Sequence, residues 1–238
     1  MPMDESVKAY RRLERMIAKL NGKTTLEIRG IPITELPPLP ENLRKLDING
    51  TNLEYLPATL PPDLEYLRVA RSPIKELPNN LPNTISTLLC INCPQLTSLP
   101  DRLPLGLTGL GLTALPKLKT LPDVVQPNLR DLSMFDTKIK CIPDNFARNL
   151  RDLHCNNSKV RNLPNIMDHI EHIVCYRCPI SSLPTNLPAT LRELTIEDGL
   201  IPHRLEGKES VINYIARIDK FKSFIAELTL TLEKYKKD

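Results

Sequence analysis

Apolar residues recur along most of this chain in a fixed pattern of about 21 residues. Each copy reads L-x-x-L-x-I, then a short polar stretch, then L-x-x-L-P, and usually a second Leu-Pro four residues later. Eight copies, spaced by 20 to 22 residues, begin at Leu43, Leu64, Ile85, Leu107, Leu129, Leu150, Ile170 and Leu191. A partial copy precedes them, with Leu26, Ile28, Ile33, Leu36 and Pro37. A period of this length predicts a solenoid of stacked repeats.

Each copy predicts one short strand when its residues are numbered from the first apolar one. Positions 4 and 6, which are Leu46 and Ile48 in the first copy, share the buried face, while positions 3, 5 and 7 face the other way. Prolines such as Pro57 and Pro61 follow, and proline lacks the N–H that a ladder or a helix interior needs. We therefore expect an α/β repeat solenoid, a horseshoe with a parallel sheet on one side and extended, polyproline-like segments on the other.

The two ends of the chain differ from the repeats and predict helices. Residues 1–22 contain Tyr10, Leu13 and Ile17 at helical spacing, a pattern typical of an amphipathic helix that closes the end of a solenoid. The solenoid itself is expected over residues 23–202. In residues 203–238 a second amphipathic helix is predicted from about 207 to 235. Its length leaves two alternatives open: a cap on a monomer, which we prefer, or a helix that pairs with another chain.

The repeat resembles the LPX class of bacterial leucine-rich repeats. That class is found in translocated effectors of the YopM kind and in the front half of the IpaH/SspH ubiquitin ligases. The resemblance is clearest at residues 43–61, 64–82, 85–104 and 170–188. It implies the fold but no particular partner, since such repeats bind unrelated proteins. Position 9, usually Asn in the class, is Thr, Ser or Cys in six copies, and related viral and amoebal repeats leave the source of the chain open.

One histidine- and cysteine-rich run in the seventh copy has the spacing of a zinc site. It reads H-x-x-H-x-x-C-x-x-C, and Cys90 and Cys93 supply another C-x-x-C pair. The repeat register argues against zinc, because Cys90, Cys155 and Cys175 occupy core position 6, while Cys93 and Cys178 occupy position 9. We expect core thiols, with no metal and no cofactor. Cys155 and Cys175 are spaced so that a disulfide is possible, but reduced thiols are preferred for a chain without a secretory signal.

No arrangement of residues predicts catalysis. His154 and His203 have no nucleophile at a telling spacing, and no Gly-rich phosphate loop occurs. The ligases that carry this repeat have their catalytic cysteine in a C-terminal domain, and no cysteine follows Leu205, so we expect no enzymatic activity. The net charge of +4 comes from scattered Lys and Arg rather than a basic stripe, which argues against nucleic acid as a partner.

The chain contains no apolar run of membrane-spanning length and no signal-peptide pattern. We therefore expect no membrane partner and a cytoplasmic protein, or one in a host's cytoplasm if it is translocated or viral.

The outward face of the strands, expected to be concave, is the candidate binding site. Most of its side chains are polar, but several apolar ones lie among them, and an exposed apolar patch usually marks a partner site. The alternative is that these are scattered surface residues. The expected partner-binding residues are Tyr66, Arg68, Leu89, Ile91, Phe135, His154, Asn156, Val174, Tyr176 and Arg177.

The sequence thus favours a non-enzymatic protein–protein interaction module, with a role as an effector or host-interaction protein. The alternative is an adaptor, or a truncated relative of a leucine-rich-repeat ubiquitin ligase, whose C-terminal helix recruits an enzyme.

Overall fold

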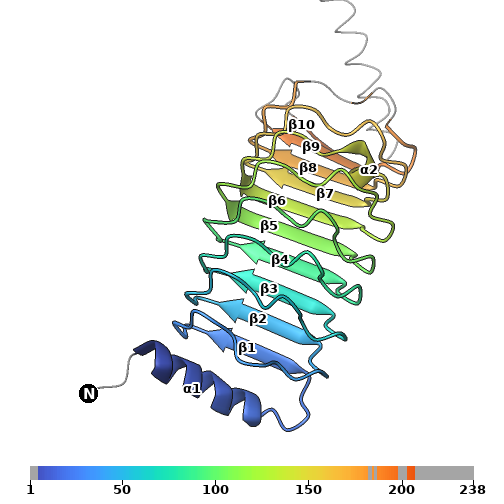
Figure 1. Ribbon diagram of the computed structural model, residues 1–238. Helices are drawn as coiled ribbons and strands as arrows, with labels where there is room; N and C mark the ends of the chain where they lie inside the picture. Colours follow the sequence, from blue (N-terminus) through green and yellow to red (C-terminus); the bar gives the residue numbers. More distant parts are fainter. Residues whose placement is uncertain (1–4, 182–183, 185–186, 198–202, 207–238) are drawn as a thin grey trace, which may run out of the picture.

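The computed structural model describes residues 5–181, 184, 187–197 and 203–206. In this part of the chain the strands form one sheet in the order in which they occur along the sequence (Figure 1). Nine parallel strands correspond to the partial copy and the eight full copies. They are β1 (Thr25–Arg29), β2 (Lys45–Asn49), β3 (Tyr66–Ala70), β4 (Thr87–Ile91), β5 (Gly109–Leu115), β6 (Asp131–Thr137), β7 (Asp152–Asn156), β8 (His172–Tyr176) and β9 (Glu193–Glu197). The predicted leucine-rich-repeat solenoid is confirmed.

Equivalent positions of successive copies pair in the sheet. Leu46 pairs with Leu67, and Leu67 pairs with Leu88, so position 4 stacks on position 4 along the described strands. Burial alternates as the pattern predicts, because positions 4 and 6 point into the core and positions 3 and 5 point out of it. The core therefore runs as one continuous column between the sheet and the return segments.

The return segments close this column with the second leucine of the Leu-Pro pattern, at position 18 of the repeat. Leu60 and Leu81 are buried there in two early copies. Among the later copies that lack the second Leu-Pro, those beginning at Leu129 and Leu150 have Phe146 and Met167 at position 18, and both side chains are also buried. Phe146 lies on α2 (Asp144–Ala147), a single helical turn, so the larger side chain comes with a local change of backbone.

In each copy from β1 to β8, one residue at or just beyond the end of the strand has a left-handed backbone, and in β5 and β6 it is the last residue but one of the strand. This is position 8, where φ lies between 49° and 68° at Gly30, Gly50, Arg71, Asn92, Ala114, Asp136, Asn157 and Arg177. Gly adopts this conformation freely and Asn and Asp tolerate it, whereas Arg and Ala adopt it at a cost. In several copies the position-8 N–H also donates to the carbonyl of the next strand, as from Arg71 to Ile91 at 2.9 Å. The left-handed conformation thus directs the chain into the return segment while the hydrogen bond to the next strand is kept.

Position 9 places small polar side chains in the core, where they bond to one another between copies. The Thr51 and Ser72 hydroxyl oxygens lie 2.9 Å apart, and the Cys93 thiol reaches the Val69 carbonyl at 3.5 Å. Leu115 interrupts this row, and the hydroxyl of Thr137 in the next copy has no hydrogen-bond partner among the described residues. A buried hydroxyl without a partner lowers stability by roughly 1–3 kcal/mol, so this coil is a weak point of the row.

The ends of the sheet are covered in two different ways. Helix α1 (Glu5–Ala18) lies against the β1 end and buries Ala9 and Leu13 (Figure 1). At the other end β10 (His203–Glu206) pairs antiparallel with β9. Residues 203–206, which precede the predicted helix, extend the sheet. The amphipathic helix predicted from about 207 to 235 lies outside the described residues.

Candidate protein-interaction surface

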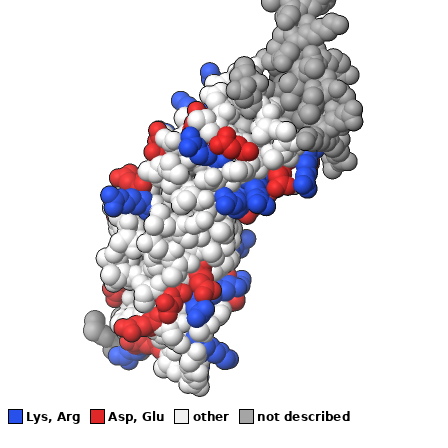
Figure 2. Space-filling model, turned by 90° about the vertical axis from the view of Figure 1, so that its right-hand side faces the viewer, with Lys and Arg blue, Asp and Glu red and all other residues white. Residues whose placement is uncertain are grey.

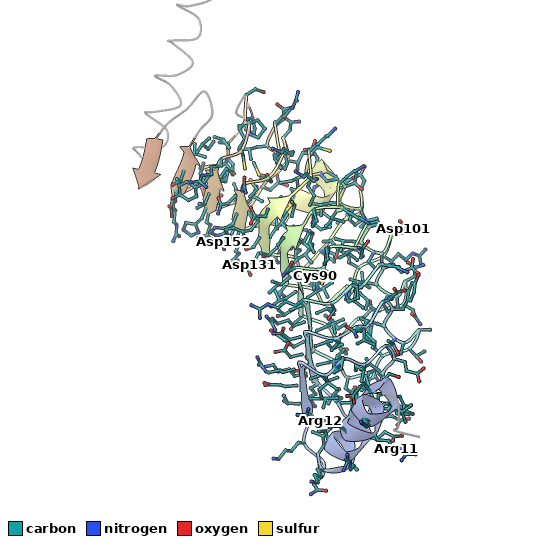
Figure 3. All side chains as sticks on the ribbon, turned by 90° about the vertical axis from the view of Figure 1, so that its left-hand side faces the viewer. Arg11, Arg12, Cys90, Asp101, Asp131 and Asp152 are labelled. Atoms are coloured by element: carbon teal, nitrogen blue, oxygen red, sulfur yellow. The ribbon has the colours of Figure 1, made fainter. Side chains whose placement is uncertain are left out.

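The outward side chains of the strands lie on the inner side of a bend. Figure 3 shows the array of strands curving, with Asp131 and Asp152 on the inner side and Asp101, from a return segment, on the opposite side. The strand face, meaning positions 3, 5 and 7 of β1 to β9, is therefore the concave surface that the sequence predicts. A concave face can contact a partner over several copies at once.

The structure places the predicted binding residues on this face. Tyr66, Arg68, Leu89, Ile91, Phe135, His154, Asn156, Val174 and Tyr176 all lie at positions 3, 5 or 7 of β3, β4, β6, β7 and β8. All of them are half-buried except Phe135, which is 36% exposed. Arg177 lies one residue beyond β8 at position 8, so it is an exposed residue of the rim rather than of the strand face.

At the β1 end, the charges of the strand face pair with one another. The Asp47 carboxylate is almost fully buried and accepts hydrogen bonds from Arg68 at 2.8 Å and from Arg29 at 3.3 Å. The Lys45 ammonium lies 5.0 Å from the centre of the Tyr66 ring. Burial, and then the Asp47 charge, raise the pKa of Tyr66. Arg68 therefore compensates a buried charge within the chain, which makes it a poor hot-spot candidate although the sequence pattern indicated it.

The middle of the strand face contains an apolar hollow of about 240 Å³. Leu89 and Ile91 line it on one side, and its floor is β5, where positions 3 and 5 are Gly109 and Gly111. A Cβ added at Gly111 would lie 2.6 Å from Cδ2 of Leu89, so Leu89 occupies the space that a side chain there would need. These glycines were not among the predicted binding residues. Two glycines at outward positions of one strand nevertheless indicate that side chains are missing from that part of the strand face.

A row of ionisable side chains follows the hollow, at position 3 of β6 to β9. Asp131, Asp152, His172 and Glu193 occupy it, and Asp152 Oδ1 lies 2.7 Å from His172 Nδ1. Partial burial, and then the neighbouring Asp152 carboxyl, raise the pKa of Asp131. The predicted binding residues include only Tyr66 from position 3, so this row was missed. The juxtaposition becomes visible only when the copies are stacked.

Two of the predicted residues on β7 and β8 are also tied to each other. The Asn156 side-chain oxygen accepts the backbone N–H of Tyr176 at 2.8 Å, so Asn156 supports the strand that carries Tyr176. Val174 and Tyr176 occupy positions 5 and 7 of β8, two residues apart on the same face. Arg68 and Asn156 thus make contacts within the chain, whereas the structure leaves the other predicted residues of the strand face as candidates for partner contacts: Tyr66, Leu89, Ile91, Phe135, His154, Val174 and Tyr176.

The flank on which the strands begin, facing the viewer in Figure 2, has charges near both ends and a largely uncharged middle. At position 2 of the repeats, Arg44 pairs with Glu65 at 2.7 Å, and Arg151 and Arg192 lie 3.7 and 3.6 Å from Glu171. Ser86 and Thr108 occupy the same position in between. These exposed pairs satisfy one another and contribute little to stability.

The cysteines of the H-x-x-H-x-x-C-x-x-C run lie in the core, as the register predicts. Cys155 and Cys175 are free thiols on neighbouring strands with their sulfur atoms 2.6 Å apart, and Cys178 bonds to the Cys155 carbonyl and lies 3.2 Å from the Ser158 hydroxyl. A hydrogen bond from the Cys155 thiol, opposed by burial, lowers the pKa of Cys178 to about 6. Within the described part of the chain, no three His, Cys, Asp or Glu residues are grouped so as to hold a metal ion.

Among the described residues, no helix has the length and the apolar composition that crossing a membrane requires.

No protein-family model and no curated protein sequence matches the chain. Several solved structures do. The leucine-rich repeat domain of the type III effector XopL is 23% identical, with a TM-score of 0.59 over 82% of each chain. YopM from Yersinia enterocolitica is 25% identical, with a TM-score of 0.63 over 84% of this chain and 45% of that one. YopM from Yersinia pestis, a leucine-rich effector protein, is 21% identical, with a TM-score of 0.57 over 84% of this chain and 72% of that one. The chain therefore has the leucine-rich-repeat fold and resembles bacterial leucine-rich-repeat effectors.

Proposed function

We propose that this chain is a non-enzymatic interaction module that binds a protein partner through its strand face. The observation that carries the proposal is the set of apolar side chains left uncovered on that face, among them Leu89, Ile91, Phe135 and Tyr176. Large apolar side chains that reach the surface on one face often mark a binding site, and aromatic side chains that a partner buries commonly supply much of the binding energy.

The structural relatives support a proposal for the role of the module. XopL is a type III effector and YopM from Yersinia pestis is an effector protein, and both share the solenoid. We infer that this chain likewise acts as an effector or host-interaction protein in the cytoplasm of the cell where its partner resides.

The proposal is tested by capture of partners on the immobilised chain from host-cell lysate, followed by quantitative mass spectrometry and measurement of Kd for the captured protein. Phe135→Ala and Tyr176→Ala are each expected to weaken binding at least about fivefold, because each removes an aromatic anchor. Arg177→Ala, on the rim, is expected to have a smaller effect.

Two changes on the return segments serve as controls. Leu105→Ala removes an apolar side chain that is 57% exposed, and Asn79→Ala removes an exposed amide; neither is expected to change Kd. The proposal is wrong if Leu105→Ala or Asn79→Ala abolishes binding while Phe135→Ala and Tyr176→Ala leave it intact.

A further inference from the structure

We propose, building on the proposed function, that the partner presents an extended segment with an apolar side chain and, two residues away, a Lys or Arg. The apolar side chain enters the hollow above Gly109, beside Leu89, and the cation pairs with the carboxylates of Asp131 and Asp152.

The hollow and the carboxylates are adjacent on the sheet. Gly109 pairs with Asp131, and Asp131 pairs with Asp152, so the three residues follow one another across β5, β6 and β7. Asp131 itself lines the hollow, together with Ser133 of the same strand. Neighbouring strands lie about 4.8 Å apart, whereas side chains two residues apart on an extended segment are about 6.6 Å apart. An extended segment that runs along the solenoid can therefore place one side chain over β5 and the next outward one between β6 and β7.

The carboxylates favour a cation at this place. In the described part of the chain no Lys or Arg forms an ion pair with Asp131 or Asp152. The arginines that precede these two residues in the sequence have other partners: Arg130 donates to the carbonyls of Pro127 and Asn149, and Arg151 pairs with Glu171.

Among the described residues, the ion pair of His172 is with Asp152, the carboxylate farther from the hollow. His154 and Arg151 also contribute positive charge near Asp131, yet the pKa of Asp131 is still raised by burial and by Asp152. A basic side chain of the partner would relieve this repulsion, whereas a phosphate group would increase it. The charge of the site therefore favours a basic peptide over a nucleic acid.

The floor of the hollow can be filled without straining the chain. A Cβ at Gly109 would meet no atom within 4 Å, and this glycine does not have a left-handed backbone. Gly109→Phe is thus expected to fold normally and to occupy the space that the partner's apolar side chain needs. Asp131→Asn combined with Asp152→Asn removes the charge with little change of shape.

The test uses a phage-displayed random peptide library, selected in parallel against the wild-type chain, Gly109→Phe, the double Asn variant and Asp101→Asn. Asp101 is an exposed carboxylate on a return segment and serves as the matched control (Figure 3). Circular dichroism and thermal unfolding verify that each variant is folded.

We expect the wild type and Asp101→Asn to enrich peptides with the spacing apolar–x–Lys/Arg. Synthetic peptides of this sequence should bind the double Asn variant about fivefold more weakly and lose affinity as salt is added, and Gly109→Phe should bind them at least tenfold more weakly.

The outcomes separate this inference from the function on which it rests. Enriched peptides that need Phe135 and Tyr176 but show no basic preference would overturn the inference and leave strand-face binding in place. Peptides whose binding is abolished by Leu105→Ala and unaffected by every strand-face change would overturn both. Failure of the wild-type chain to enrich any sequence over empty beads would also overturn the inference.

Discussion

Replacing Leu67 with Asp is expected to lower the free energy of unfolding by at least about 4 kcal/mol. Leu67 is fully buried at position 4 of β3, between Leu46 and Leu88 of the neighbouring copies. Truncating a buried leucine alone costs about 2–5 kcal/mol, and the aspartate adds the cost of an unpaired carboxyl in an apolar column. Urea denaturation followed by circular dichroism measures the loss.

The matched control is Leu105→Asp, because Leu105 is largely exposed on a return segment. Its effect should stay within about 0.5 kcal/mol. Because repeats contact mainly their neighbours, Leu67→Asp should also broaden the transition as the coils around β3 open first. Equal midpoints for the Leu67→Asp variant and the wild type would contradict the repeat register.

Phe146→Ala is expected to lower the free energy of unfolding by about 3–5 kcal/mol, since the ring is fully buried on α2 and its removal leaves a cavity. The residue occupies the position that leucine holds in earlier copies, where it closes the core against the return segment. Thermal and urea unfolding of the purified variant measure the loss.

Phe135→Ala is the control for this change, as it removes the same side chain from the strand face. Because Phe135 is partly exposed, its truncation should cost less than about 1 kcal/mol. If the two substitutions were equally destabilising, the assignment of Phe146 to the core and Phe135 to the binding face would have to be abandoned.

Much of the fold was predictable because the same pattern of apolar residues repeats eight times in the sequence. A single L-x-x-L-x-I segment is ambiguous between helix and strand, but repetition every 20 to 22 residues fixes which residues of all copies share a face. The register also assigned Cys90, Cys155 and Cys175 to the core, and the structure confirms that they are buried.

Other features depend on contacts between copies or on backbone conformation, which the pattern does not contain. The left-handed conformation at position 8 could not be predicted, because Arg71, Ala114 and Arg177 occupy this position in some copies where others have glycine. The role of Arg68 could not be predicted, because its partner Asp47 lies in the preceding copy. Strand β10 shows no repeat pattern, and it forms by pairing with the exposed edge of β9.

The candidate surface could likewise be predicted only in part. Periodicity identified the face and its apolar members, Leu89, Ile91, Phe135, Val174 and Tyr176, but it could not find features made by several strands together. The hollow requires Gly109 and Gly111 on β5 next to Leu89 on β4, and the acidic pair requires Asp131 and Asp152 from successive copies.

Hydroxyl-radical footprinting of the chain, free and bound to its captured partner, tests the central claim most directly, because it reports the exposure of individual side chains. If the partner binds the strand face, oxidation of Leu89, Phe135 and Tyr176 should fall when the complex forms. Oxidation of Leu105, and of Tyr55, whose ring is half exposed away from the strand face, should not change. Protection of Leu105 and Tyr55 with unchanged oxidation of Phe135 and Tyr176 would place the partner on the return segments and contradict the account.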